Sequence, residues 1–126
     1  MILQGIKEKS TNKQKQLAVL IDPDKGHPEH LAKLATMANE AKVDLFFIGG
    51  SLMVGNEMEE TIRTIKSLSD IPVVLFPGSP SQVCDKADGI LLLSLISGRN
   101  ADLLIGKHVE AAPLLKHSGL DILSTG

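Results

Sequence analysis

Five short apolar runs recur along this chain, and they constrain its fold more than any other feature of the sequence. Each run is almost continuously apolar instead of alternating, which is typical of strands covered on both faces, as in parallel sheets. The runs occupy residues 17–21, 43–48, 71–76, 89–93 and 120–123. Between them the sequence predicts helices at residues 30–42, 57–69 and 105–118, a connection of one or two turns at 80–86, and a small leading helix at 3–9.

The predicted helices carry apolar stripes at amphipathic spacing. In the last of them we expect Val109, Ala112 and Leu115 to face the core, with Gly119 as the C-cap. Strands that alternate with helices in this way predict one α/β domain over residues 1–126 with a parallel sheet. A doubly wound sheet of five strands suits this length, whereas a (β/α)8 barrel typically needs about 250 residues. Length alone therefore favours the doubly wound sheet.

Composition limits the function classes. The net charge of −2 gives no basic footprint for nucleic acid. Cys84 is the only cysteine, so an internal disulfide is impossible and a reducing compartment is expected. The apolar runs are too short to span a bilayer, and the first residues show no signal-peptide core. We expect a cytoplasmic protein.

The polar and glycine-rich segments follow the carboxyl ends of the predicted strands, where both α/β architectures place their sites. After the first run stands Asp22-Pro23-Asp24. This segment reads either as a solvated turn or as a carboxylate, Asp22, offered to a hard cation such as Mg²⁺. Asp24 is the weaker candidate because it points elsewhere if the strand geometry persists.

Two further segments are candidates of lower specificity. Gly49-Gly50-Ser51 follows the second run, where glycines let a ligand approach the backbone and the Ser51 hydroxyl can bind a phosphate or a metal; a plain turn explains it equally well. Arg99-Asn100 reads as a surface turn. His27, His30, His108 and His117 lack zinc-ligand spacing and read as surface or internally satisfied histidines.

Taken together, the motifs resemble the geranylgeranylglyceryl phosphate synthase family, in particular its bacterial branch, which is related to the heptaprenylglyceryl phosphate synthases. They are VLIDPDK, FFIGGSLM, VVLFPGSPSQV, ILLLSLISGRNADLLIGKHVEAA and DILSTG, and they cover essentially the whole chain in order. The resemblance implies the N-terminal half of a (β/α)8 TIM barrel, with about five parallel strands and intervening helices, in which residues 121–126 form the fifth strand. It thereby reverses the preference drawn from length.

The resemblance also implies an activity. Family members are Mg²⁺-dependent prenyltransferases of phospholipid biosynthesis, which join geranylgeranyl diphosphate or a related polyprenyl diphosphate to the C3 hydroxyl of sn-glycerol 1-phosphate. It assigns Asp22 and Ser51 to Mg²⁺, and Gly50, Ser51 and Ser94 to substrate, with a prenyl groove beginning near Ser94–Ser97. It implies no covalent nucleophile. A homo-oligomer and peripheral contact with a membrane are expected.

Some of the family's contacts with glycerol phosphate have no counterpart in this sequence. Leu20 stands where some members carry a basic residue that helps bind glycerol phosphate, and the family's main phosphate-binding loops would lie after Gly126. Two alternatives to this function stay open. In the first, the chain is an inactive, self-associating half-barrel; in the second, it is a receiver-like signalling domain. The receiver alternative lacks its phosphoacceptor Asp after the third strand and its Lys after the fifth.

Overall fold

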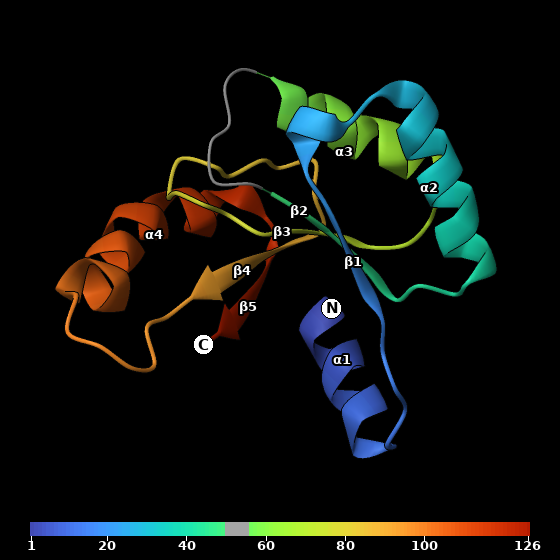
Figure 1. The fold of residues 1–126 in the computed structure, drawn as a ribbon. Helices are drawn as coiled ribbons and strands as arrows, with labels where there is room; N and C mark the ends of the chain where they lie inside the picture. The colour runs from blue at the N-terminus through green and yellow to red at the C-terminus, as the bar shows by residue number, and fades with distance from the viewer. Residues whose placement is uncertain (50–55) are drawn as a thin grey trace.

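The structure, a computed structural model, describes residues 1–49 and 56–126 as a parallel sheet with helices packed on it (Figure 1). In chain order the elements are α1 (Ile2–Thr11), β1 (Ala18–Ile21), the 3-10 turn η1 (Pro23–Lys25), α2 (Pro28–Glu40), β2 (Leu45–Ile48), α3 (Glu57–Leu68), β3 (Val73–Leu75), β4 (Gly89–Leu93), the π-helical turn η2 (Asp102–Gly106), α4 (Lys107–Ser118) and β5 (Asp121–Thr125).

The strands pair in the order in which they occur in the chain, β1-β2-β3-β4-β5, and every pair is parallel. A doubly wound sheet reverses its strand order at a switch point, whereas a (β/α)8 barrel places each new strand beside the previous one. The preference for a doubly wound sheet that length alone suggested is therefore wrong. The connection at residues 80–86 forms turns and no helix.

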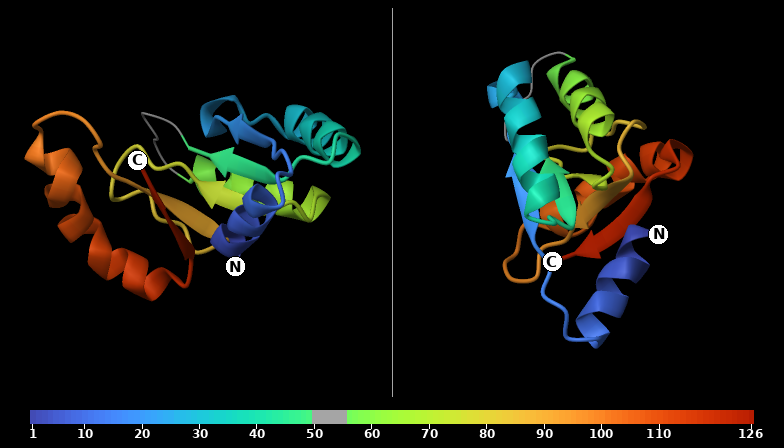
Figure 2. Two further views of the ribbon diagram at one scale, coloured as in Figure 1. Left: turned by 90° about the horizontal axis from the view of Figure 1, so that it is seen from below. Right: turned by 90° about the vertical axis from the view of Figure 1, so that its right-hand side faces the viewer.

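The two faces of the sheet are covered by different helices. Phe46, Ile48, Val73 and Leu75 are fully buried against α2, α3 and α4. The alternate residues, which include Leu45 and Val74, face the other way and pack against α1. Figure 2 shows α1 set apart from the other three helices. Because both faces carry apolar side chains, the strands read as continuous apolar runs.

The predicted stripes are correct in the middle of α2 and α3, but they fail at the ends of these helices, where Ala41 and Leu68 are exposed, and in part of α4. In α4, Leu115 is buried as expected, but Val109 is 67% exposed and Ala112 is also exposed, while Ala111 takes the inward position. The helix is preceded by the π-helical turn η2, and a π-helical turn holds more residues than an α-helical turn. Within α4 itself the buried residues Ala111 and Leu115 are four positions apart, the spacing of one face of an α-helix.

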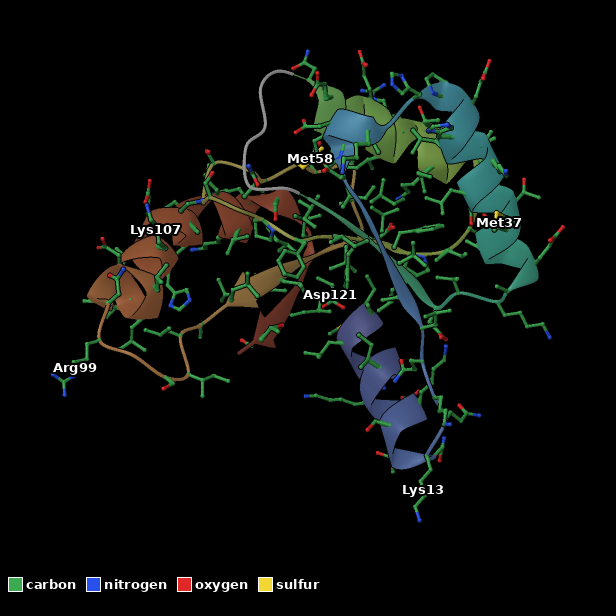
Figure 3. All side chains as sticks on the ribbon, viewed as in Figure 1. Lys13, Met37, Met58, Arg99, Lys107 and Asp121 are labelled. Atoms are coloured by element: carbon green, nitrogen blue, oxygen red, sulfur yellow. The ribbon has the colours of Figure 1, made fainter. Side chains whose placement is uncertain are left out.

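Two polar contacts, one near each end of α1, hold this helix to the sheet. The backbone N–H of Leu3 donates to Asp121 Oδ2 at 3.1 Å, and Figure 3 shows Asp121 beside the start of this helix. Near the other end, Lys9 pairs with Asp44. The hydrogen bond from Lys9, together with the backbone N–H of Leu17, holds the pKa of the Asp44 carboxyl below its usual value. The pair therefore stabilises the fold at neutral pH, and this contribution is lost as the pH falls through that lowered pKa.

Gly49, directly after β2, sits where no side chain can fit. A Cβ at this position would lie 1.8 Å from the carbonyl oxygen of Phe76, which follows β3. Backbone hydrogen bonds join the end of β2 to both neighbouring strands at this point. Gly49 N–H donates to Ile21 O of β1 at 3.3 Å, and Phe76 N–H, directly after β3, donates to Ile48 O at 2.8 Å. Glycine is therefore required here to keep the ends of three strands in register.

We predict that Gly49→Ala destabilises the protein by at least about 1–3 kcal/mol, because the methyl group forces the strand ends apart. Gly5→Ala is the matched control: its Cβ meets nothing within 4 Å, and alanine in helix α1 is expected to stabilise by about 0.5–1 kcal/mol. Thermal unfolding followed by circular dichroism measures both. Equal effects of the two substitutions would contradict the steric role of Gly49.

Candidate functional site

The carboxyl ends of all five strands lie along one edge of the sheet, because every pair is parallel. Asp22 follows β1, Gly49 follows β2 and Ser94 follows β4. The sequence places its polar and glycine-rich segments at this same edge. The candidate site is therefore assembled from consecutive strand ends.

Asp22 is held in place by its own turn. Its Oδ1 accepts a hydrogen bond from the backbone N–H of Asp24 at 3.2 Å and caps η1, and Pro23 behind it is buried. Gly26 closes the turn against the buried Thr61 of α3, with room for no side chain. Residues 22–26 thus form a turn that holds Asp22 at the end of β1, and Asp24 is exposed to solvent. Residues 1–49 and 56–126 donate no hydrogen bond to the second oxygen, Oδ2.

Gly50 and Ser51, which the sequence assigns to substrate and metal, lie outside the described residues. The residue just before them is well placed, because Gly49 N–H bonds to Ile21 O, one residue before Asp22. The segment that leaves β2 therefore starts beside the Asp22 turn. In the described part of the chain, no three His, Cys, Asp or Glu side chains converge as a metal cluster.

An apolar cavity of about 370 Å³ opens where β3 and β4 separate. Only two residue pairs join these strands, whereas five pairs join β4 to β5. The Pro77–Pro80 segment and α4 line the gap that results. The apolar side chains of the lining are Val83, Ile90, Leu91, Leu92, Leu93, Leu95, Leu103, Ala111 and Leu115.

Polar groups lie among the lining of this cavity. They include Ser79, Ser94, Lys107 and His108. The His108 Nε2 lies 2.8 Å from the Leu93 carbonyl oxygen and 3.3 Å from Ser94 Oγ. The interpretation of His108 as an internally satisfied histidine is confirmed, but its contact with the predicted substrate residue Ser94 was missed. No spacing in the sequence signals it, because the contact depends on how α4 packs against β4.

Arg99 and Asn100 form the surface turn that the sequence predicts. Asn100 Oδ1 accepts a hydrogen bond from Asp102 N–H at 3.1 Å and so fixes the start of η2. Figure 3 shows Arg99 at the outer tip of this loop, pointing away from the sheet. These residues shape the connection between β4 and α4 and do not line the cavity.

A polar depression of about 690 Å³ lies at the opposite end of the sheet, beside the amino ends of β2 and β3. Two of its lysines are engaged in ion pairs, Lys9 with Asp44 and Lys66 with Asp88. Asp88 also accepts a hydrogen bond from the Val73 N–H, so its carboxylate joins strand ends. Barrel enzymes place their chemistry at the carboxyl ends of the strands, so we locate the site there.

A sequentially ordered parallel sheet with a polar carboxyl edge defines this fold as the N-terminal half of a (β/α)8 barrel, the class of architecture in which enzyme sites occupy that edge. Residues 9–126 match the PcrB family, and the chain belongs to that family. The resemblance seen in the sequence motifs is confirmed.

Relatives match this chain over only part of their own length. Geranylgeranylglyceryl phosphate synthase from Chitinophaga pinensis is 58% identical over 112 residues, which are 89% of this chain and 44% of the relative. The protein of that name from Spirosoma linguale is 54% identical over 113 residues, 90% of this chain and 45% of its own. The chain thus spans just under half the length of these curated relatives.

The solved structures give the same picture. (S)-3-O-geranylgeranylglyceryl phosphate synthase from Thermoplasma acidophilum, crystallised with its substrate sn-glycerol-1-phosphate, superimposes with a TM-score of 0.87 at 32% identity. The match covers 97% of this chain and 49% of that one. Among the described residues, no helix is long and apolar enough to cross a membrane.

Proposed function

We propose that this chain supplies the N-terminal half of a barrel enzyme that transfers a polyprenyl group from its diphosphate to the C3 hydroxyl of sn-glycerol 1-phosphate. The observation that carries this proposal is the apolar cavity beside β4, with polar groups at the carboxyl edge of the sheet. A polyprenyl diphosphate has a long apolar chain and a charged head, and this combination suits such a cavity. The proposed compartment is the cytoplasm, in keeping with the single free cysteine.

The acceptor is proposed from the family. The relatives named above are geranylgeranylglyceryl phosphate synthases, and the Thermoplasma acidophilum enzyme was crystallised with sn-glycerol-1-phosphate. In this chain, Leu20 at the end of β1 is apolar and cannot bind a phosphate. We therefore expect the phosphate of the acceptor to be bound by residues outside this half of the barrel.

The reaction exchanges one bond for another at the first carbon of the prenyl chain. The C3 hydroxyl oxygen forms the ether bond to this carbon, the bond from the carbon to the diphosphate oxygen breaks, and diphosphate leaves with the electron pair. The hydroxyl proton is released. The chain's contribution is to hold the prenyl chain in the cavity and to bring both reactants to the same edge, which lowers the entropic cost of their encounter.

The donor set at the carboxyl edge fits a Mg²⁺ ion. Asp22 presents a carboxylate at the end of β1, and Ser51 follows the neighbouring strand, although its position lies outside the described residues. Mg²⁺ is usually held by one or two carboxylates together with substrate phosphates, so a larger cluster of acidic side chains is not required. When bound, the metal would neutralise the charge that develops on the departing diphosphate.

The activity is tested in a chimaera, because the relatives are about twice as long. Residues 9–126 replace the matching segment of the Chitinophaga pinensis protein, and prenylglyceryl phosphate formation is measured with geranylgeranyl diphosphate and sn-glycerol 1-phosphate. We expect Mg²⁺-dependent product. A folded chimaera without activity, beside an active parent protein, would refute the proposal.

In the active chimaera, we predict that Asp22→Asn lowers Mg²⁺-dependent kcat/KM by about two orders of magnitude or more, because a neutral amide is a poor ligand for a hard cation. The amide oxygen can still accept the Asp24 N–H, so the turn is retained. Asp24→Asn is the control and should have little effect. Similar losses in both variants would remove the basis for choosing Asp22.

A second candidate function, a self-associating half-barrel without activity, is favoured by the inner face of the sheet. Leu20 is 60% exposed, and Phe76 and Leu93 are also exposed. Leu20 pairs with Phe47, which packs against the α1 cluster. Phe76 and Leu93 each lie two residues after a member of that cluster, so they face the same side of the sheet. Apolar surface of this kind promotes association.

We therefore predict that the 126-residue chain by itself forms dimers or larger species and yields no prenylglyceryl phosphate. Sizing chromatography with light scattering measures its mass, and Leu20→Lys, which places a charge on the inner face, should shift the population toward monomer. A monomeric and active 126-residue chain would contradict this expectation.

A further inference from the structure

The gap between β3 and β4 leaves the end of β4 without a strand partner on one side. Pairing with β3 stops at Ile90, so Leu91 to Leu93 have no counterpart in β3. The carbonyl oxygen of Leu93 instead faces His108 Nε2 at 2.8 Å. A side chain of α4 thus supplies a hydrogen bond that the neighbouring strand does not.

This contact fixes where the proton of His108 resides. A carbonyl oxygen can only accept, so the short contact requires the hydrogen to be on Nε2. Ser94 Oγ lies 3.3 Å from the same nitrogen. Since Nε2 is a donor, it cannot accept from Ser94. Its single hydrogen is directed mainly at the Leu93 carbonyl, so Ser94 Oγ at 3.3 Å can share it only as a weaker second acceptor, and the Ser94 hydroxyl hydrogen remains available for another acceptor.

The backbone around Ser94 is held from two further sides. Ser94 N–H donates to Thr125 O of β5 at 2.8 Å, and Leu95 N–H donates to Leu103 O of η2 at 3.2 Å. Together with the His108 contact from α4, these bonds hold the short segment against three elements: β5, η2 and α4. Such a segment presents its hydroxyl in a defined position at the cavity lining.

We propose that His108 is a positioning residue that orients the Ser94 hydroxyl as a donor to a diphosphate oxygen of the polyprenyl substrate whose chain occupies the cavity. This inference rests on the proposed function and assigns His108 a task within it. The partner of Ser94 must be a hydrogen-bond acceptor, such as an anionic oxygen, because a protonated Nε2 does not accept the Ser94 hydroxyl hydrogen. His108 itself does not touch the reacting atoms.

Binding of geranylgeranyl diphosphate to the 126-residue chain, measured by isothermal titration calorimetry, tests the role of His108. His108→Leu should raise Kd about five- to tenfold, the usual effect of one lost hydrogen bond. His108→Gln should bind within about twofold of the wild type, since the amide N–H lies the same number of bonds from the backbone. His117→Leu is the matched control, because the His117 ring lies 2.8 Å from a carbonyl of its own helix, that of Pro113, and does not line the cavity.

A double-mutant cycle separates positioning from general support of the fold. Ser94→Ala should raise Kd by a similar factor, and the double variant with His108→Leu should be no weaker than the weaker single variant, because both changes remove one interaction. Additive losses would show that His108 acts independently of Ser94 and would overturn the proposal. So would failure of His108→Gln to restore binding.

The outcomes also distinguish this proposal from the proposed function. A wild-type chain that binds no geranylgeranyl diphosphate refutes the prenyl-binding cavity and the role of His108 together. Wild-type binding that is unchanged in His108→Leu refutes the positioning role alone. Amide hydrogen exchange of Ser94 and Leu95 gives a readout without ligand: we expect faster exchange in His108→Leu and protection close to wild type in His108→Gln.

Discussion

Parallel pairing in strict chain order is the constraint on which the rest of this structure depends. Because every pair of strands is parallel, all the strands end at the same edge of the sheet, and Asp22, Gly49 and Ser94 lie along that edge although they are far apart in sequence. The steric requirement at Gly49 belongs to the same constraint, since it lets the ends of β1, β2 and β3 meet at hydrogen-bonding distance.

The apolar cavity is a consequence of where this pairing fails. β3 is short, and it is followed by the prolines at 77 and 80 instead of a helix, so nothing regular fills the space between it and α4. The aliphatic residues of β4 and α4 then line an opening where a barrel of uniform β/α units would be packed. The apolar cavity thus results from leaving one helix out of the repeat.

The sequence predicts the strands and helices well because their signals are local. Continuous apolar runs and amphipathic stripes depend only on neighbouring residues, and Gly119 adopts the left-handed conformation expected of a C-cap. The face of α4 was predicted incorrectly at Val109 and Ala112, because the sequence does not show which apolar residues of this helix meet the sheet. The turn at Asp22 was predicted because it is encoded within three residues. The contact of His108 with Leu93 was not predicted, because it depends on the docking of an entire helix.

The attachment of α1 has a consequence for the order of folding. Its hydrogen bond from Leu3 reaches Asp121, which is 118 residues away in the sequence, and the cluster beneath it includes Leu91 and Leu123. This helix precedes all five strands in the sequence, yet its binding surface does not exist until β4 and β5 have been added. Contacts of such high sequence separation form slowly, so α1 is synthesised before the sheet and reaches its place after it.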